Sequence, residues 1–250
     1  DEILDWCNRL VDACARTGMR YMLGETTYFR PQTMYSRRRA AAGDFGHFLH
    51  ADAQYFHDVD SPSCNLRDVS KHRANSAAGR EWKEFSKKYR DRNVRSGPMH
   101  YPTHSVSGPV CVMKAHAVKV CAFGYRDPDK DPFHGDGFSN ETALFRMNNG
   151  ATMRICEYRQ IGQPEEDMFR LFGSKGAFRE NQWADKHGYT PLTVEEMRDP
   201  LPEEVHTAFQ GCCMKADLFG EFGGHGGSHP YLVNEFVSSV AEGRQPAINA

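Results

Sequence analysis

The spacing of apolar residues in the first 30 positions predicts a helix followed by a buried strand. Over residues 3–14 apolar side chains recur at helical spacing, and Gly18 supplies a stop signal. Residues 19–23 are a short continuous apolar run between two glycines, which is typical of a buried strand. A helix, a tight turn and a buried strand form the last unit of an α/β sheet. We therefore expect the chain to begin late within such a sheet, with the other strands outside it.

A second helix and a long strand follow. After Pro31 the pattern predicts a helix through residue 42, where Gly43 closes it. Over residues 45–58 the apolar period changes to two, which predicts a strand. Tyr55 and His57 are two positions apart in this strand, so they are expected to project from the same face.

From Val110 onward the chain reads as an antiparallel sheet joined by short turns. Residues 148–150 and 173–176 are hairpin signals, because Asn and Gly tolerate positive φ. Residues 184–228 are rich in Pro and Gly and predict irregular structure, and residues 231–241 predict a closing amphipathic helix. The strands expected in this half of the chain are 118–125, 142–147, 152–158, 168–172 and 177–180.

Composition narrows the class of protein. Hydrophobic residues make up 39% of the 250 positions, with 16 Phe, 10 Tyr and 3 Trp, so a packed core is expected and a disordered chain is excluded. The formal net charge of −2 gives no drive toward nucleic acid or anionic lipid. No apolar run approaches the ~18 residues that span a membrane. Eight scattered Cys without a C-x-x-C motif exclude a disulfide scaffold, a zinc ribbon and a thioredoxin-like site.

One segment departs from this neutral balance. Between Lys71 and Arg95 there are nine Lys or Arg against three acidic residues, a surplus of six positive charges. A solvated loop and helix accounts for such a segment. A phosphate-binding patch is the alternative, although the segment lacks the regular aromatic residues of a nucleic-acid surface.

Titratable groups stand at the ends of the predicted strands, where sites are usually built. Glu25 follows the expected strand 19–23, and ligands of open α/β sheets bind outside the carboxyl ends of strands. A surface Glu in a turn is the alternative. Tyr55 and His57 end the next strand, and an imidazole beside a phenol can favour the phenolate and handle protons. A half-buried aromatic with its hydrogen-bond partner would look the same.

Two further stretches concentrate histidine. Residues 100–104 hold His100, Tyr101 and His104 around a stiffening proline, which suits a preorganised site whose His titrates near neutrality. Residues 223–230 place His225 among glycines, which let the backbone approach a ligand closely, although a flexible loop has the same composition.

A divalent metal is an alternative occupant of these side chains. His57, His100 and His104 could ligate one together with Glu25, because imidazole and carboxylate are common ligands. Their spacing carries no metal signature, so we do not assign a metal to them.

These segments together resemble the C-terminal portion of the Gfo/Idh/MocA oxidoreductases. The likeness is greatest to the branch of NAD-dependent glycosidases that act on N-acetylgalactosaminides, and it covers nearly the whole chain. The motifs that carry it are G-E at 24–25, A-Q-Y-F-H-D at 53–58, G-P-M-H-Y-P-T-H at 97–104, N-G-A at 149–151 and G-H-G-G at 224–227.

The resemblance implies a fold and a division into domains. The fold is α+β, with an open, mainly antiparallel sheet that carries helices on one face, preceded by the last helix and strand of a Rossmann domain. Residues 1–28 would be the remnant of that dinucleotide-binding domain. Residues 29–250 would bind the substrate and form the oligomer.

The resemblance also implies a chemistry. In such glycosidases NAD takes a hydride from C3 of the sugar, the ketone acidifies the proton on C2, and elimination expels the leaving group. His104 would be the base at the oxidised hydroxyl, with Tyr55 and His57 handling protons at the neighbouring carbon. The residues expected to contact the sugar are Glu25, Tyr101, His100 and His225.

Two departures from the family pattern qualify this expectation. The Gly-rich dinucleotide turn and the Glu-Lys-Pro segment are absent, so these 250 residues alone are not expected to bind NAD or NADP or to turn over. His100 stands where many sugar dehydrogenases have Asp, which favours the glycosidase-like branch.

Other functions stay open at this point. One is a simple sugar or inositol-type dehydrogenase that leaves the C1 bond intact, and another is a non-catalytic carbohydrate-binding domain without its cofactor half. In each case the expected partner is a small sugar or glycoside rather than nucleic acid or a membrane. An exposed sheet face predicts a homodimer or a higher homo-oligomer. The resemblance points to a bacterial protein, and either the cytoplasm or the periplasm would suit it.

Overall fold

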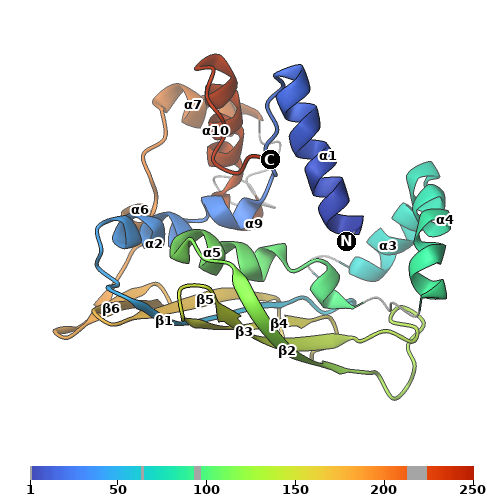
Figure 1. Ribbon diagram of the computed structural model, residues 1–250. Coiled ribbons are helices and arrows are strands. Elements are labelled where there is room, and N and C mark those ends of the chain that lie inside the picture. Colours follow the sequence, from blue (N-terminus) through green and yellow to red (C-terminus); the bar gives the residue numbers. More distant parts are fainter. Residues whose placement is uncertain (1, 63–64, 93–96, 213–223) are drawn as a thin grey trace. The chain divides into compact units, whose positions relative to one another are not determined.

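The computed structural model describes residues 2–62, 65–92, 97–212 and 224–250. The chain divides into two compact units (Figure 1): residues 39–191 form one, and residues 1–38 with residues 192–250 form the other. Residue 223 of the glycine-rich stretch and residues 93–96 of the basic segment lie outside the described residues. No described helix is long and apolar enough to cross a membrane.

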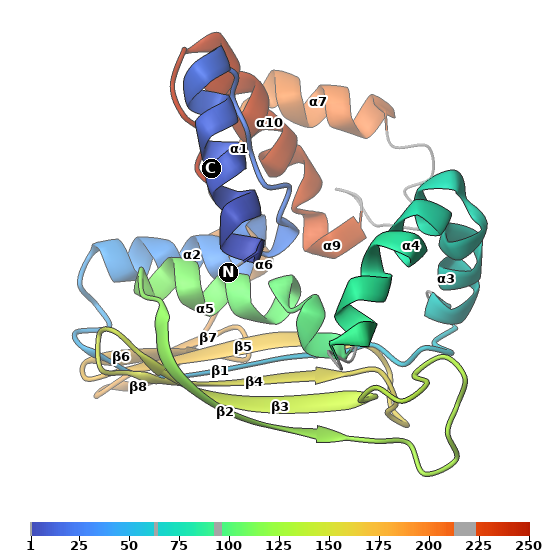
Figure 2. The same ribbon diagram turned by 45° about the vertical axis from the view of Figure 1, so that its right-hand side comes forward.

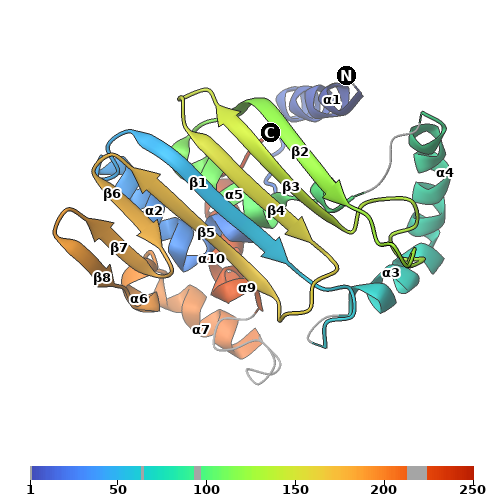
Figure 3. The same ribbon diagram turned by 90° about the horizontal axis from the view of Figure 1, so that it is seen from below.

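The unit of residues 39–191 is built on an open sheet of eight strands in the order β2-β3-β4-β1-β5-β6-β7-β8 (Figure 3). β1 and β4 run parallel, and the other neighbouring pairs in this order are antiparallel. The predicted α+β fold with an open, mainly antiparallel sheet is therefore confirmed. The strands are β1 Phe48–Phe56, β2 Ala117–Tyr125, β3 Asn140–Met147, β4 Thr152–Tyr158, β5 Glu166–Gly173, β6 Gly176–Arg179, β7 Gln182–Asp185 and β8 Gly188–Pro191.

The two predicted hairpins, β3–β4 and β5–β6, form at their Asn and Gly turn signals. At the β3–β4 turn Gly150 has φ of +89°, a value that side chains with a Cβ rarely adopt. The turn closes with a hydrogen bond from the Met147 N–H to the Ala151 carbonyl, 2.8 Å long. Another hairpin, β7–β8, lies mostly in the stretch for which we expect irregular structure, and that expectation is wrong there. Strands of four residues are too short to show a period of two.

Helix α5 (Thr103–Met113) lies along one face of the sheet, against β1, β4 and β5 (Figure 2). Sheet was expected from Val110 onward, and this is wrong for the last turn of α5, because a short apolar run does not distinguish a buried helix from a strand. The contact is close: a Cβ on Gly108 would lie 3.0 Å from the Phe169 ring. The strand positions under α5 are apolar, with Ala51, Ala53, Ile155 and Leu171 fully buried.

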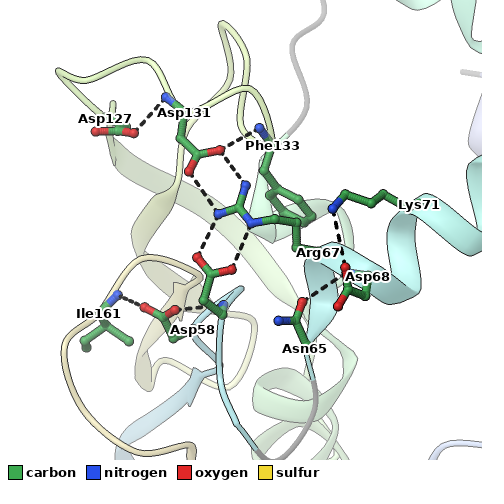
Figure 4. Close-up of polar contacts among 10 residues, drawn as sticks. Asp58, Asn65, Arg67, Asp68, Lys71, Asp127, Asp131, Phe133 and Ile161 are labelled. Carbon is green, nitrogen blue, oxygen red and sulfur yellow. Dashed lines mark hydrogen bonds and ion pairs between the residues drawn. The ribbon is translucent and has the colours of Figure 1, made fainter.

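Helices α3 (Leu66–Asn75) and α4 (Ala77–Asp91) carry the basic segment, and they have no buried residues among those described. Arg67 connects α3 to the loop between β2 and β3 (Figure 4). Its guanidinium donates to both oxygens of Asp60, each at 2.8 Å, and to both of Asp131 at 2.7 and 2.9 Å. This hydrogen bonding lowers the pKa of Asp131 to about 2. The positive charge of Arg67 is therefore paired with these two carboxylates, and this pairing joins α3 to the loop.

The second unit is helical. A core of Phe29, Met34 and Tyr231 holds it together. The predicted helices at its start, after Pro31 and near the C-terminus all form. The helices are α1 Glu2–Thr17, η1 Thr26–Phe29, α2 Pro31–Ala41, α6 Val194–Met197, α7 Glu203–Cys212, α9 Gly224–Gly227 and α10 His229–Ala241, of which α2 continues into the first unit.

The strand expected at residues 19–23 is wrong. This segment is irregular, and the Met19 side chain is 69% exposed. A buried parallel strand needs a neighbour on each side. Here the backbone finds one hydrogen bond to the C-terminal segment, from the Leu23 N–H to the Ile248 carbonyl at 3.0 Å.

Candidate functional site

Tyr55 and His57 form a buried pair at the C-terminal end of β1. The alternation of the strand places Ala51, Ala53 and Tyr55 on the face toward α5, and His57 follows directly after the strand. The Tyr55 hydroxyl lies 2.6 Å from Nδ1 of His57. Both side chains are less than 10% exposed. The two residues therefore share one face, as their spacing predicts, and they are hydrogen-bonded to each other.

His104 joins this pair from the first turn of α5. The centre of its ring lies 4.8 Å from that of Tyr55. The ring of Tyr101 lies 5.9 Å from His104 on the other side, and Tyr101 is 61% exposed. Two segments about fifty positions apart in the sequence thus bring Tyr55, His57, Tyr101 and His104 together at one end of the sheet.

The remaining predicted site residues are placed differently. His100 is exposed and ends the short helix η2 (Pro98–His100). Glu25 and His225 belong to the other unit. There the buried carboxylate of Glu25 caps η1 by accepting a 2.8 Å hydrogen bond from the Thr27 N–H. His225 has left-handed backbone angles, and its ring centre lies 5.1 Å from that of His229. The sugar contacts expected of these three residues stay predictions.

The electrostatics of the pair differ from the expectation in one respect. Burial raises the pKa of Tyr55 above its ordinary value, the nearby Glu165 carboxylate adds to the effect, and Arg159 opposes it. The idea that His57 favours a phenolate is therefore wrong for this geometry. A phenol with a raised pKa keeps its proton at neutral pH, and the Tyr55 hydroxyl lies within hydrogen-bonding distance of Nδ1 of His57.

Carboxylates that the sequence reasoning missed surround this pair. Oε1 of Glu165 lies 3.5 Å from the Tyr55 hydroxyl and 3.8 Å from Nδ1 of His57. Asp167 lies opposite Tyr55 in the β1–β5 register. Glu165 comes just before β5, so its approach depends on strand pairing across more than a hundred residues and has no local signal.

Comparisons of sequence and of structure show which known proteins this chain resembles. No family model matches the chain. A glycosyl hydrolase family 109 protein of Solibacter usitatus (strain Ellin6076) is 24% identical over 275 residues, with 98% of this chain and 56% of that protein covered. The crystal structure of an oxidoreductase domain protein from Kribbella flavida superposes with a TM-score of 0.64 at 18% identity, over 96% of this chain and 61% of that one. Levoglucosan dehydrogenase in complex with NADH and levoglucosan gives 0.63 and 17%, over 95% and 61%.

The resemblance to the Gfo/Idh/MocA oxidoreductases is confirmed. At these identities the solved structures establish the fold, and the curated relative supports the glycosidase side of the resemblance. The chain spans little more than half the length of that relative.

The sequence of this chain lacks the motif that holds a dinucleotide in Rossmann folds. Pyrophosphate binding in Rossmann folds needs a Gly-rich turn between a parallel strand and a helix. The sequence has no such motif, and residues 19–23 form no strand. We therefore assign no cofactor contact to this chain. Nor do the described ranges contain a group of three or more His, Cys, Asp or Glu arranged to hold a metal ion, so the structure gives no support to the metal alternative.

Proposed function

We propose that the protein containing this chain is an NAD(P)-dependent sugar-processing oxidoreductase that hydrolyses a glycoside by oxidising C3 and eliminating the C1 substituent. The observation that carries the proposal is the cluster of Tyr55, His57 and His104 beside an exposed Tyr101. Similarity to a glycosyl hydrolase and to a sugar dehydrogenase supports both halves of it. The cofactor would be held mainly by residues outside this chain, and when bound it accepts and returns a hydride.

The residues of this chain would carry out the proton transfers. His104 takes the proton of the hydroxyl that is oxidised, because an imidazole is a base near neutral pH. Tyr55 and His57 serve the neighbouring carbon as a relay, in which the phenol passes its proton to the imidazole while it takes the proton from C2, and the relay runs back when water adds. Tyr101 offers an exposed aromatic face to the sugar, with the exposed His100 as a further sugar contact. The acidic neighbours Glu165 and Asp167 favour neutral sugars over sugar acids by charge.

Two variants of the full-length protein test this assignment. His104→Ala and Tyr55→Phe should each lower kcat for a chromogenic glycoside by about 100-fold or more, since each removes a proton-transfer group. The control is Tyr189→Phe in β8, an exposed phenol with no place in the cluster, which should leave kcat unchanged. Full activity in both site variants would overturn the proposal.

A simple sugar dehydrogenase is the second candidate function, because levoglucosan dehydrogenase shares the fold. The same chromogenic substrate separates the two. Release of the aglycone without net NADH supports glycoside hydrolysis, whereas steady accumulation of NADH supports a dehydrogenase. Sugar binding that is indifferent to the dinucleotide would support the non-catalytic alternative.

We also propose that the protein forms a homodimer, or a higher homo-oligomer, through the sheet face opposite α5. That face exposes Phe123, Tyr125 and Leu144, which lie on the neighbouring strands β2 and β3 (Figure 3). Contiguous apolar side chains at a sheet surface favour burial against another protein surface. A second copy of the same face would supply it by two-fold symmetry.

A further inference from the structure

We propose that Glu157 is a positioning residue that holds His104 and Tyr55 in their working arrangement. The inference rests on the proposed function, since it assigns a role within the same site. Glu157 is buried in β4, beneath the first turn of α5. It would act through two neighbours, Ser105 and Arg159.

The carboxylate of Glu157 lies where its strand should be apolar. In β4 the side chains toward α5 are Met153, Ile155 and Glu157, and all three are buried. Glu157 is 0% exposed. A buried carboxylate is costly unless it is paired and hydrogen-bonded, and an apolar residue of similar size commonly gives equal or greater stability. Stability alone is therefore a weak reason for a Glu at this position.

One oxygen of Glu157 fixes the first turn of α5. Oε1 accepts a hydrogen bond from the Ser105 hydroxyl, which also lies 3.1 Å from the Pro102 carbonyl. Ser105 directly follows His104. The residue at the N-cap of α5 is Pro102, whose side chain offers no capping hydrogen bond. The bond to Glu157 therefore anchors this turn to the sheet, and with it the backbone that carries His104.

The other oxygen of Glu157 reaches the Tyr55 side of the site. Oε2 accepts a 2.8 Å hydrogen bond from Nη2 of Arg159. The guanidinium of Arg159 lies 4.8 Å from the centre of the Tyr55 ring and donates at 3.3 Å to the Tyr55 carbonyl. Glu157 is thus the common partner of α5 and β1, the elements that supply His104 and Tyr55.

The charge of Glu157 adds a dependence on pH. Burial raises the pKa of its carboxyl to about 7, against the opposing effect of Arg159. The groups that face it are Ser105 from α5, Arg159 just after β4, Tyr55 from β1 and Asp167 from β5. Above about pH 7 the carboxylate binds both of its neighbours. Below that pH the protonated carboxyl binds Arg159 less strongly, and the arrangement loosens.

Kinetics of the full-length enzyme provide the first test. Glu157→Gln and Ser105→Ala should each lower kcat about 10- to 100-fold with KM changed less than about threefold, because misplacing a catalytic group by about 1 Å has that effect on rate. The double variant should be little worse than either single one, because both break the same link. In the wild type, protonation of Glu157 should lower kcat as the pH falls through about 7. In Glu157→Gln this contribution to the pH dependence of kcat should be absent. The matched control is Glu166→Gln, whose carboxylate bonds Gln54 and Gln163 and points away from α5.

A readout without substrate keeps the two proposals separable. At pH 8 the 13C signal of the His104 ring, assigned with His104→Ala, should shift in Glu157→Gln and in Ser105→Ala but not in Glu166→Gln. If that signal is unmoved in both test variants, Glu157 does not position His104, whatever the activity. If the signal moves as expected while the wild type attacks no glycoside and oxidises no sugar, the positioning role stands and the proposed function fails.

Discussion

The two faces of the sheet are built from alternate residues of the same strands, yet they carry different side chains. Under α5 the strands present Ala53, Ile155 and Leu171, with Tyr55 and Glu157 at one end. The opposite face exposes large apolar rings and, within β1, β4 and β5, an ion-pair row in which Asp52 bonds Arg154 at 2.8 Å and lies 3.9 Å from Arg170. Helix α5 covers the first face, whereas on the second face Arg154 is partly exposed and large apolar side chains stay in contact with water.

This contrast teaches where function can be placed on such a sheet. On the covered face every polar group must find a protein partner, so Tyr55, His57 and Glu157 are held in fixed geometry. On the open face Arg154 keeps 45% of its side chain exposed, so its ion pair contributes little to stability. The covered face suits proton transfer, and the open face suits association.

The largest expected effect is a difference in the free energy of unfolding when one apolar side chain is truncated on each face. Ile155→Ala is expected to lower the free energy of unfolding by about 2–5 kcal/mol, because it leaves a cavity under α5. Leu144→Ala on the adjacent strand should cost about 1 kcal/mol or less, since Leu144 is 51% exposed. Urea denaturation of both variants, at protein concentrations low enough to avoid association, measures the two values. Equal losses would mean that the open face is packed as tightly as the covered one.

Much of this contrast was predictable from local sequence. The alternation over residues 45–58 predicted β1 and the shared face of Tyr55 and His57, and the 148–150 turn predicted the β3–β4 hairpin. These signals work because a period of two and a turn residue are local properties of the chain.

The rest depended on neighbours that are distant in the sequence. The apolar run at the end of α5 fits a strand as well as a helix. Its contact with β1 shows that it is a helix covering the sheet. Glu157 looks like an ordinary alternating polar residue until the register places it beside Tyr55, about one hundred positions away. The Met and Leu at residues 19 and 23 belong to a sequence pattern that forms a strand only when partner strands flank it.

The second expected effect is a pH dependence that only the covered face should show. The pKa of Glu157 is raised from an ordinary 4.5 to about 7 by burial, so the folded protein binds this proton more tightly than the unfolded chain. The resulting stability is fully present below about pH 4.5 and is lost as the pH rises through 7, by at most about 3 kcal/mol. Between pH 5 and pH 8, Glu157→Gln should therefore gain stability relative to the wild type.

Urea denaturation at the two pH values checks this, with Glu166→Gln as the control on the open face. A constant difference between Glu157→Gln and the wild type at pH 5 and pH 8 would contradict the raised pKa. If Glu157→Gln gains stability and loses kcat, the buried charge of Glu157 serves the geometry of the site and lowers the stability of the fold.

The smallest expected effect concerns the open face. Phe123 is 79% exposed, next to Tyr125 on β2 and near Leu144 on β3. Phe123→Asp should raise the dissociation constant of the proposed dimer about 30-fold or more, as loss of a central aromatic does at protein interfaces. Sedimentation velocity over a concentration series measures it, and Lys119→Gln, which makes the charge of the same face of β2 more negative by the same one unit, controls for charge alone. The free energy of unfolding of the monomer should hardly change, because Phe123 is already in water there. If wild-type protein is monomeric at micromolar concentration, the association role of this face is wrong, and the apolar rings need another partner.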